Sequence, residues 1–345
     1  MSRLVGCVLV AVALVSVIGS AGPTAAVAAT PPPPTVATGG LGLRLVDVPV
    51  SERDDPRAQE YIIDHLAPGA VIHRRIEVSN TTGAGLKVAV YAAAATIAKG
   101  SFLGSAGHTP NDLTSWSAVS PSTTEVAARG TQMAIVTISV PSDAAPGERY
   151  GVVWAEVRSA PVGGGGVVQV SRVGIRLYLS VGPGGPPAAN FTIASLTAER
   201  APDGQPMVVA DVRNTGGRAL DMSGSLDLLA GPGGLRAGPF PATLGVTLAI
   251  GDSEPVSITL DRQLPAGPWD ARVTLRSGLL QRSARASLTF PAAGAALPVR
   301  AASVGSGALY PALVVVALLL VAMAVLVEAI RRRRSRRGPV STPVS

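Results

Sequence analysis

An apolar run near the C-terminus, from Tyr310 to Ile330, constrains this chain more than any other stretch. Apart from Pro311 and Glu328, the run is almost entirely Ala, Val, Leu and Met. As an α-helix it is roughly 31 Å long at about 1.5 Å per residue. That length matches the hydrocarbon core of a bilayer, about 30 Å thick. A helix packed on a soluble core would have a polar face, which this run lacks. We therefore predict one C-terminal transmembrane helix over residues 310–330.

The residues that flank this run predict its orientation. Tyr310 stands at one end, and the other end is followed directly by Arg331, Arg332, Arg333 and Arg334. Segments rich in Lys and Arg remain on the cytoplasmic side of a membrane. We expect a single-pass protein of the cell membrane, with a basic cytoplasmic tail over 331–345 and its N-terminal domains outside the cell. The tail can also bind anionic lipid headgroups.

The N-terminus has the three parts of a secretory signal peptide. Arg3 supplies the positive charge, Leu4 to Ile18 is apolar, and Ala26-Val27-Ala28 fits a cleavage site. We expect cleavage after Ala28, so that residues 1–28 are the signal peptide. The only cysteine, Cys7, lies within it. The exported chain is therefore expected to form no disulfide bond.

The basic pI of the whole sequence suggests a nucleic-acid partner, but the charge of the exported part does not. A sequence pI of about 10.3 is typical of nucleic-acid-binding proteins. Of the 29 basic residues, six lie in the tail and one is Arg3, which leaves 22; of the 22 acidic residues only Glu328 lies outside the exported part, which leaves 21. The exported part is thus nearly neutral, at +1, and lacks the basic stripe that phosphate backbones require. We predict no nucleic-acid partner. The preference for Arg over Lys, with much Ala, Gly, Pro and Val, indicates a bacterial source.

The exported part is long enough for two domains of ordinary size. A Pro-rich linker is predicted over 29–40, and a first domain over 41–182 in which apolar residues alternate with polar ones at the period of a β-strand. Examples are Ile72, Arg74, Ile76 and Val78 on one face of a strand, and the alternation from Val173 to Val181. Gly163 to Gly166 is predicted to be a hairpin loop. A Gly/Pro linker over 183–189 ends this domain.

A second series of short strands follows over 190–291, separated by turn residues and without a helical period. Six or seven strands in about 100 residues are typical of an immunoglobulin-like β-sandwich. An Ala/Gly/Ser-rich juxtamembrane stalk is predicted over 292–309. The predicted fold class is all-β, with two immunoglobulin-like β-sandwich domains and one transmembrane helix.

Motifs for catalysis and metal binding are missing from the sequence. It has no Gly-x-Ser-x-Gly elbow and no His-Glu-x-x-His motif. His65, His73 and His108 are far apart and have no metal-ligand spacing. Two of the residues Asp47, Asp54 and Asp55 could in principle form a pair of catalytic carboxylates, but a solvated loop explains these acidic residues equally well. We predict a protein that is not an enzyme, without a catalytic site, metal or cofactor.

The candidate ligand-binding residues are Trp116 and Phe102. Both lie in the irregular segment from Ala95 to Val126, which is either functional or carries short strands. Loops on a rigid sandwich are common places for binding residues. Trp116 is interpreted either as a ring exposed for binding or as a core residue. Asn80-Thr81-Thr82 matches a glycosylation acceptor, and we interpret this match as chance.

The first domain resembles the peptidoglycan-binding domain of the WxL-interacting proteins, a family of bacterial surface proteins. The similar stretches cover about residues 41 to 182 and include Leu43 to Pro49, Tyr61 to Gly69, Ile76 to Thr81, Ala95-Thr96, Gly100 to Phe102, Val140-Pro141, Pro146 to Gly151 and Val173 to Val181. In that family a signal peptide, this domain, a second β-domain, one transmembrane helix and a basic tail follow in that order. The resemblance implies attachment to peptidoglycan and docking of partner surface proteins.

The sequence therefore predicts a membrane-anchored binding protein of the cell surface. Its expected partners are peptidoglycan or another cell-wall glycan, WxL-type or other surface proteins, and the membrane. Two alternatives stay open at this point: an exported hydrolase of wall polymers, and a structural stalk or adhesin. Paired acidic residues in a cleft would favour the hydrolase.

Overall fold

A computed structural model describes residues 40–159, 168–304 and Met323. The predicted cleavage site at Ala28, the predicted loop 163–166, and the tail with Arg331 to Arg334 lie outside these residues. The predicted membrane span 310–330 also lies outside them, apart from Met323. Within the described ranges, no helix is both long enough and apolar enough to cross a membrane. The transmembrane helix therefore stays a prediction.

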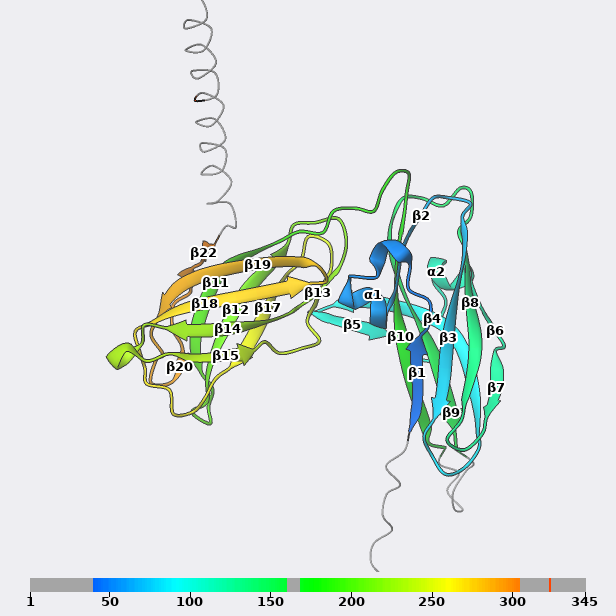
Figure 1. The fold of residues 1–345 in the computed structure, drawn as a ribbon, viewed down its shortest axis with the longest axis horizontal. Coiled ribbons are helices and arrows are strands. Elements are labelled where there is room, and N and C mark those ends of the chain that lie inside the picture. Colours follow the sequence, from blue (N-terminus) through cyan, green and yellow to red (C-terminus); the bar gives the residue numbers. More distant parts are fainter. Residues whose placement is uncertain (1–39, 160–167, 305–322, 324–345) are drawn as a thin grey trace, which may run out of the picture. The chain divides into compact units, whose positions relative to one another are not determined.

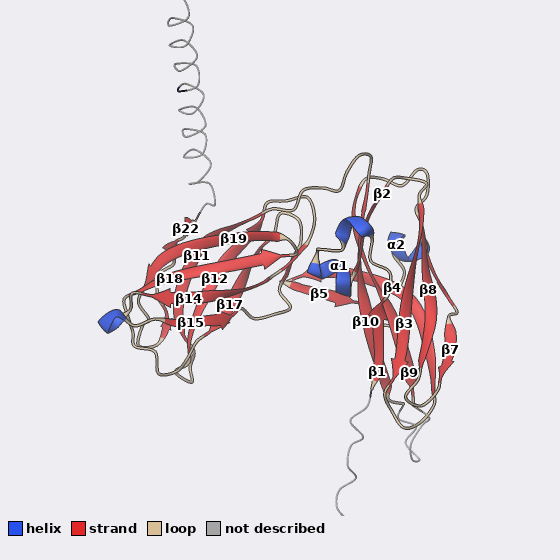
Figure 2. Ribbon diagram, in the orientation of Figure 1, coloured by secondary structure: helices blue, strands red, loops and turns tan. Residues whose placement is uncertain are grey.

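Nearly all regular structure is β-strand, which confirms the all-β prediction for the described residues (Figure 2). The strands form two sets that pair only within themselves, β1 to β10 and β11 to β22. The described residues of both sets belong to one compact unit. Each set contains two principal sheets with a shared apolar core, the architecture of an immunoglobulin-like β-sandwich (Figure 1).

The first sandwich has one sheet in the order β1-β3-β8-β6 and another in the order β2-β10-β9-β4-β5, with β7 paired to β4. Its elements are β1 (Leu41–Leu45), the 3-10 helix η1 (Val50–Glu52), α1 (Pro56–Glu60), β2 (Ile62–Leu66), β3 (Val71–Asn80), β4 (Leu86–Ala98), β5 (Ser101–Gly104), α2 (Asp112–Ser115), β6 (Ser117–Ser120), β7 (Thr123–Val126), β8 (Thr131–Ser139), β9 (Gly147–Arg158) and β10 (Val170–Val181).

The beginning of the chain contributes to both sheets of this sandwich. β1 pairs antiparallel with β3, and after η1 and α1 the chain continues as β2, which pairs parallel with β10. In that register His65 lies opposite Ser180. The charged segment between β1 and β2, which the sequence indicated as a loop, therefore carries two short helices.

Alternation along the strands produces the first core. Ile76 and Val78 of β3 and Val153 and Ala155 of β9 belong to the same apolar core, and all four are almost completely buried. Burial of a Val, Leu or Ile side chain contributes about 1.5–3 kcal/mol. The alternation of apolar and polar residues in the sequence thus indicates which face of each sheet points to the core.

The segment from Ala95 to Val126 is mostly regular. Strand β4 continues to Ala98, and β5, α2, β6 and β7 follow. Of the two sequence interpretations of this segment, the short strands are the one that the structure shows. They were hard to recognise because each has only four residues.

The second sandwich has sheets in the orders β17-β12-β11-β20, with β21 also on β11, and β15-β14-β18-β19-β22; β13 and β16 form a separate pair. Its elements are β11 (Phe191–Arg200), β12 (Pro206–Asn214), β13 (Leu220–Asp221), β14 (Ser223–Leu229), η2 (Pro232–Gly234), β15 (Ala237–Pro241), β16 (Thr247–Leu248), β17 (Ser253–Thr259), β18 (Trp269–Ser277), β19 (Leu280–Leu288), β20 (Gly294–Ala295), β21 (Val299–Arg300) and β22 (Ala302–Ser303). Trp269 and Phe191 are its largest fully buried side chains.

Part of the predicted stalk 292–309 belongs to this sandwich. β20 and β21 pair with β11, and β22 pairs with β19. Ala296 and Ala301 pack against the second core. The Ala/Gly/Ser composition suggested a solvated spacer, but small side chains also allow a chain to lie close against a sheet edge.

A buried asparagine occupies the same structural position in both sandwiches. The side-chain amide of Asn80, at the end of β3, donates to the carbonyls of Ala84, Val126 and Ala127. Asn214, at the end of β12, donates in the same way to Arg218, Leu248 and Ala249. Each side-chain oxygen accepts from the backbone N–H two residues later. Asn80 is 1% exposed, which agrees with interpreting its glycosylation motif as chance.

Candidate functional site: a charged cavity at the junction of the sandwiches

Trp116 lies half-buried beside α2. It follows α2, whose first turn is held by a reciprocal capping box between Asn111 and Thr114. The half-buried indole packs against the first core. The guanidinium carbon of Arg149 lies 4.7 Å from the ring centroid. The structure therefore supports the core interpretation of Trp116.

Phe102 belongs to a different cluster. It lies on β5, and its ring centroid is 5.2 Å from that of Tyr178 and 6.5 Å from that of Tyr150. Arg176 lies over the same ring at 4.8 Å. This cluster also includes Ala219 of the second sandwich. Phe102 is thus part of the contact between the sandwiches, and the two candidate residues are not brought together.

Asp221 of β13 is the centre of that contact. Its Oδ2 accepts a hydrogen bond from Nε of Arg57 at 2.8 Å. Its Oδ1 accepts from Nη1 of Arg176 at 2.8 Å, the hydroxyl of Tyr178 at 2.9 Å and the hydroxyl of Thr247 at 2.7 Å. Three of these four donors come from the first sandwich. One carboxylate therefore joins both domains.

The short helix α1 places Arg57 for this role. Asp55 caps the helix by accepting from the Arg57 N–H at 2.9 Å, and Pro56 occupies the first turn. Burial lowers the pKa of Arg57, while the charges of Asp221, Tyr178 and Asp55 raise it, and the net direction is upward. The guanidinium also lies 4.8 Å from the centroid of Tyr178, a cation–π distance.

Backbone contacts join the sandwiches at two more points. The N–H of Thr247 donates to the carbonyl of Gly100 at 2.8 Å. At the β18–β19 turn, Gly278 has φ +57° and lies so close to Asp55 that a Cβ there would be 2.6 Å from its carboxylate oxygens. Glycine is therefore required at Gly278 for both backbone conformation and space.

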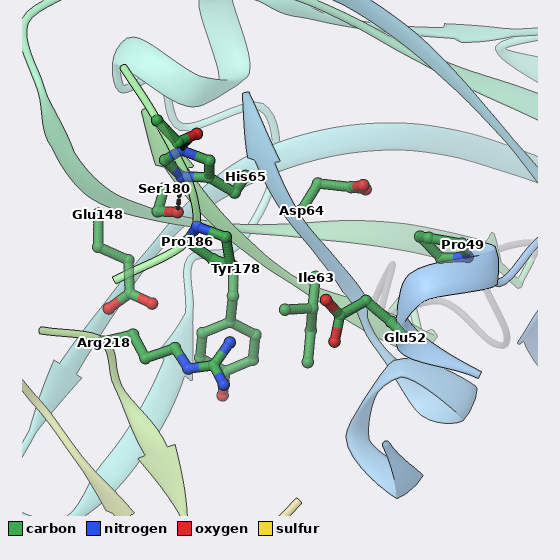
Figure 3. A pocket seen from close by; sticks show the side chains of 11 residues that line it. Pro49, Glu52, Ile63, Asp64, His65, Glu148, Tyr178, Ser180, Pro186 and Arg218 are labelled. Atoms are coloured by element: carbon green, nitrogen blue, oxygen red, sulfur yellow. Dashed lines mark hydrogen bonds between the residues drawn. The ribbon is translucent and has the colours of Figure 1, made fainter. Parts of the chain in front are cut away.

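Beside this contact lies a cavity of about 360 Å³. Most of its wall comes from the first sandwich, the 183–189 linker contributes Gly184 and Pro186, and the second sandwich contributes Arg218. Figure 3 shows Glu148 and Arg218 on one side and Glu52 on the other, with Tyr178 and Ile63 between them. The cavity therefore combines an apolar centre with charged groups at its sides.

Several polar groups of this wall already have partners. Nδ1 of His65 lies 2.7 Å from Oγ of Ser180, and its Nε2 lies 3.1 Å from the carbonyl oxygen of Gly184 (Figure 3). Both carboxylate oxygens of Asp64 accept from Arg74. Burial raises the pKa of Asp64, against the lowering effect of Arg74.

Glu148 is the buried acid of the cavity. Its Oε2 accepts from the hydroxyl of Tyr150 and from the backbone N–H of Ala219, each at 2.7 Å. Burial raises the pKa of Glu148, although these hydrogen bonds and the charges of Arg57 and Arg218 lower it. Burial and the neighbouring Glu148 raise the pKa of Tyr150. A positive group that entered the cavity would stabilise the ionised form of Glu148.

The Ser180–His65 pair has the spacing of a nucleophile and its base, but other features favour a structural role. The two residues are cross-strand neighbours in the β2–β10 ladder. Ser180 is 7% exposed. The second ring nitrogen faces the carbonyl of Gly184, whereas catalytic triads place a carboxylate there. The pair therefore ties strands and linker together.

Sequence reasoning missed Arg57, Asp221, Glu148 and Arg218. Each is an ordinary charged residue in the sequence, and Arg57 and Asp221 are 164 positions apart. One usable signal was Asp55-Pro56, which marks a helix start. No sequence pattern indicates which acid a guanidinium from that helix will contact.

Comparison with known proteins leaves the family unassigned. No family model matches the chain, and no curated protein sequence matches it. The resemblance to WxL-interacting proteins therefore stays a prediction.

Similar solved structures exist at low identity. The Pseudomonas aeruginosa CupB2 chaperone is 12% identical, with 66% of this chain and 97% of that one covered and a TM-score of 0.34. The E. coli chaperone DraB is 11% identical, with 70% and 94% covered and a TM-score of 0.34. A structure of the Salmonella enterica SafA pilin in complex with the SafB chaperone is 11% identical, with 76% and 95% covered and a TM-score of 0.37.

These comparisons correct the function predicted from the sequence. The three structures named above are two chaperones and a pilin–chaperone complex, and none of them is named as a peptidoglycan-binding protein. The prediction of a protein that attaches to peptidoglycan at the cell wall is therefore wrong, as is the hydrolase alternative. Strand-and-turn patterns led to it, and such patterns describe a β-sandwich without describing its ligand.

Proposed function

We propose that this chain is a non-enzymatic binding protein whose two sandwiches hold a polypeptide partner at their junction. The observation that carries the proposal is the cavity of about 360 Å³ with walls from the first sandwich, the linker and Arg218 of the second. Ligand pockets are commonly about 300–1,000 Å³ in volume. Of the partners predicted from the sequence, a protein partner is the one that we retain.

The surroundings of the cavity support this proposal. Asp221 and its donors Arg57, Arg176, Tyr178 and Thr247 fix the junction with hydrogen bonds of 2.7–2.9 Å from donors in both sandwiches. A wall that is already ordered costs little conformational entropy when a partner binds. A pocket that is apolar at its centre and polar at its sides suits a side chain that anchors a protein interface.

Site-specific photo-crosslinking in the cells that make the protein tests this proposal. A photoreactive amino acid replaces Pro49, at the cavity wall, or Met133, on the exposed side of β8 far from the cavity lining. We expect a discrete cross-linked protein from position 49 and none from position 133. The partner is then identified by mass spectrometry, purified and titrated against the wild-type protein. Equal cross-linking at both positions, or none at position 49, would contradict the proposal.

We also propose a location for this binding, supported by the sequence. The apolar run 310–330 and the arginines after it favour a membrane anchor that leaves both sandwiches outside the cell. Protease added to intact, wall-stripped cells should then degrade the sandwiches and leave a small membrane fragment. Complete protection of residues 40–304 would contradict this location.

A further inference from the structure

We propose that the junction cavity binds a basic side chain, a lysine or arginine of the polypeptide partner. This inference rests on the proposed function, because it specifies what the partner places in the same cavity.

Most polar groups of the wall are already engaged. Among the described residues, His65 and Ser180 contact each other, Asp64 is paired with Arg74, and the Tyr178 hydroxyl donates to Asp221. The groups left are charged. The side-chain carboxylate of Glu52 forms no hydrogen bond or ion pair with another described residue. Oε1 of Glu148 likewise accepts no hydrogen bond, since both bonds of this carboxylate go to Oε2.

Arg218 is the one cation among these remaining groups. It forms no ion pair within 4 Å in the described part of the chain, and its Nε is buried without a hydrogen-bond partner. Asp64 is neutralised by Arg74. Among the residues that line the cavity, the remaining charges are therefore those of Glu52 and Glu148 against Arg218, a net charge of −1.

The net charge of these remaining groups determines whether the cavity favours an anionic or a cationic ligand. A carboxylate ligand would gain Arg218 but would bring a third negative charge beside Glu52 and Glu148. A cation gains two carboxylates with free oxygens and meets one like charge. Charge-assisted hydrogen bonds to a carboxylate are also among the stronger polar contacts in proteins. The cavity therefore favours a cation.

The centre of the cavity suits the stem of a long basic side chain. Ile63, Tyr178 and Pro186 line it, and Lys and Arg bury their methylene stems against apolar surface while the charged end reaches polar groups. A free metal ion would use none of this apolar wall. Among the described residues there is also no group of three acidic or histidine side chains placed to hold a metal.

Peptide binding to the purified full-length protein tests the inference. The probes are three acetylated, amidated pentapeptides, Ala-Ala-X-Ala-Ala, with arginine, its neutral isostere citrulline, or glutamate at X. We expect the arginine peptide to bind at least about tenfold more tightly than the other two, because one charge-assisted hydrogen bond is typically worth about 1.5–3 kcal/mol. Equal binding of the arginine and citrulline peptides, or tighter binding of the glutamate peptide, would overturn the inference.

Charge variants of the wall locate the effect. Glu52→Gln and Glu148→Gln should each weaken binding of the arginine peptide by about tenfold, whereas Arg218→Gln should strengthen it, because a like charge is removed. Asp211→Asn is the matched control, since it removes an exposed carboxylate on β12 that does not line the cavity. Thermal unfolding of each variant confirms that it is folded. Unchanged binding in both glutamate variants would overturn the inference.

The cross-linking experiment separates this inference from the proposed function. Cross-linking from position 49 together with no preference for the arginine peptide would leave the binding function intact and reject the basic side chain. Neither cross-linking nor peptide binding would reject both. Cross-linking with an arginine preference that Glu52→Gln and Glu148→Gln reduce would support both.

Discussion

Nε of Arg57 lies 2.8 Å from Oδ2 of Asp221, and this hydrogen bond joins a helix of the first sandwich to a strand of the second. Both side chains are largely buried, at 9% and 16% exposed. A buried ion pair is costly to break, because the partner that remains is an uncompensated charge in a poorly solvated place. The junction between the sandwiches therefore depends on one acid.

Replacing this acid should weaken the junction. Asp221→Asn removes the counterion of Arg57 and Arg176, and we expect the free energy of unfolding to fall by about 3 kcal/mol. Urea unfolding followed by circular dichroism measures the change. Asp203→Asn is the control, because it breaks an ion pair with Arg262 whose side chains are 57% and 62% exposed and should cost less than about 1 kcal/mol. Similar losses in the two variants would contradict the role of Asp221.

A pair of glycines tests the contact between α1 and the β18–β19 turn. Gly278 and Gly107 have φ values of +57° and +61°, so alanine at either position costs about 1–2 kcal/mol of backbone strain. A Cβ at Gly107 meets no other atom within 4 Å, whereas one at Gly278 meets the carboxylate of Asp55. Gly278→Ala should therefore destabilise the protein more than Gly107→Ala in the same thermal melt. Equal destabilisation would mean that the two elements do not touch.

Glu148 should make the protein less stable as the pH rises. Its pKa is raised in the folded protein, so the folded state binds its proton more tightly than the unfolded state. Its contribution is thus most favourable below the ordinary glutamate pKa and is lost as the pH rises through the folded pKa. Glu148→Gln preserves an oxygen for Tyr150 and Ala219 and should remove this loss. Urea unfolding between pH 4 and 8 measures the effect.

Glu156 provides a control of opposite sign for that measurement. The hydrogen bond from Tyr91 is the largest cause that lowers its pKa, with further lowering by Arg158. Its contribution to stability is therefore present above the ordinary glutamate pKa and is lost as the pH falls through the folded pKa. Glu156→Gln should flatten the acid side of the stability profile, whereas Glu148→Gln should flatten the side above it. Changes of the same sign would contradict this assignment.

The two buried asparagines should matter more than a partly buried one. Asn80→Ala and Asn214→Ala each leave three carbonyls without a side-chain donor. We expect each variant to lose about 3 kcal/mol of stability, because an unsatisfied buried polar group costs about 1–3 kcal/mol. Asn190→Ala removes only an acceptor for Arg282 at the protein surface and should cost less than about 1 kcal/mol. Thermal unfolding measures the stability of the three variants. An equally small loss of stability in all three would contradict the role of Asn80 and Asn214 in holding the neighbouring backbone segments.

Local sequence predicted the sheets well. The alternation from Val173 to Val181 lies within β10, and the apolar positions Ile76 and Val78 are fully buried in β3. A strand presents every second side chain to the same face, so the positions of its apolar residues show which face is buried. The sequence did not show that the side chain of Asn80, at the end of β3, holds the backbone at Ala84 and Val126.

The candidate site could not be predicted in this way. Trp116 attracted attention as an isolated aromatic residue, yet whether it is exposed depends on α2, Arg149 and the first core. Arg57 and Asp221 are 164 residues apart, and they meet because the first sandwich, the linker and the second sandwich fold together. The sequence by itself thus determined the period-two pattern that makes both sandwiches. Only the tertiary structure decided which charges are buried together and where they leave a cavity, because such contacts depend on the docking of distant segments and not on the pattern within any one of them.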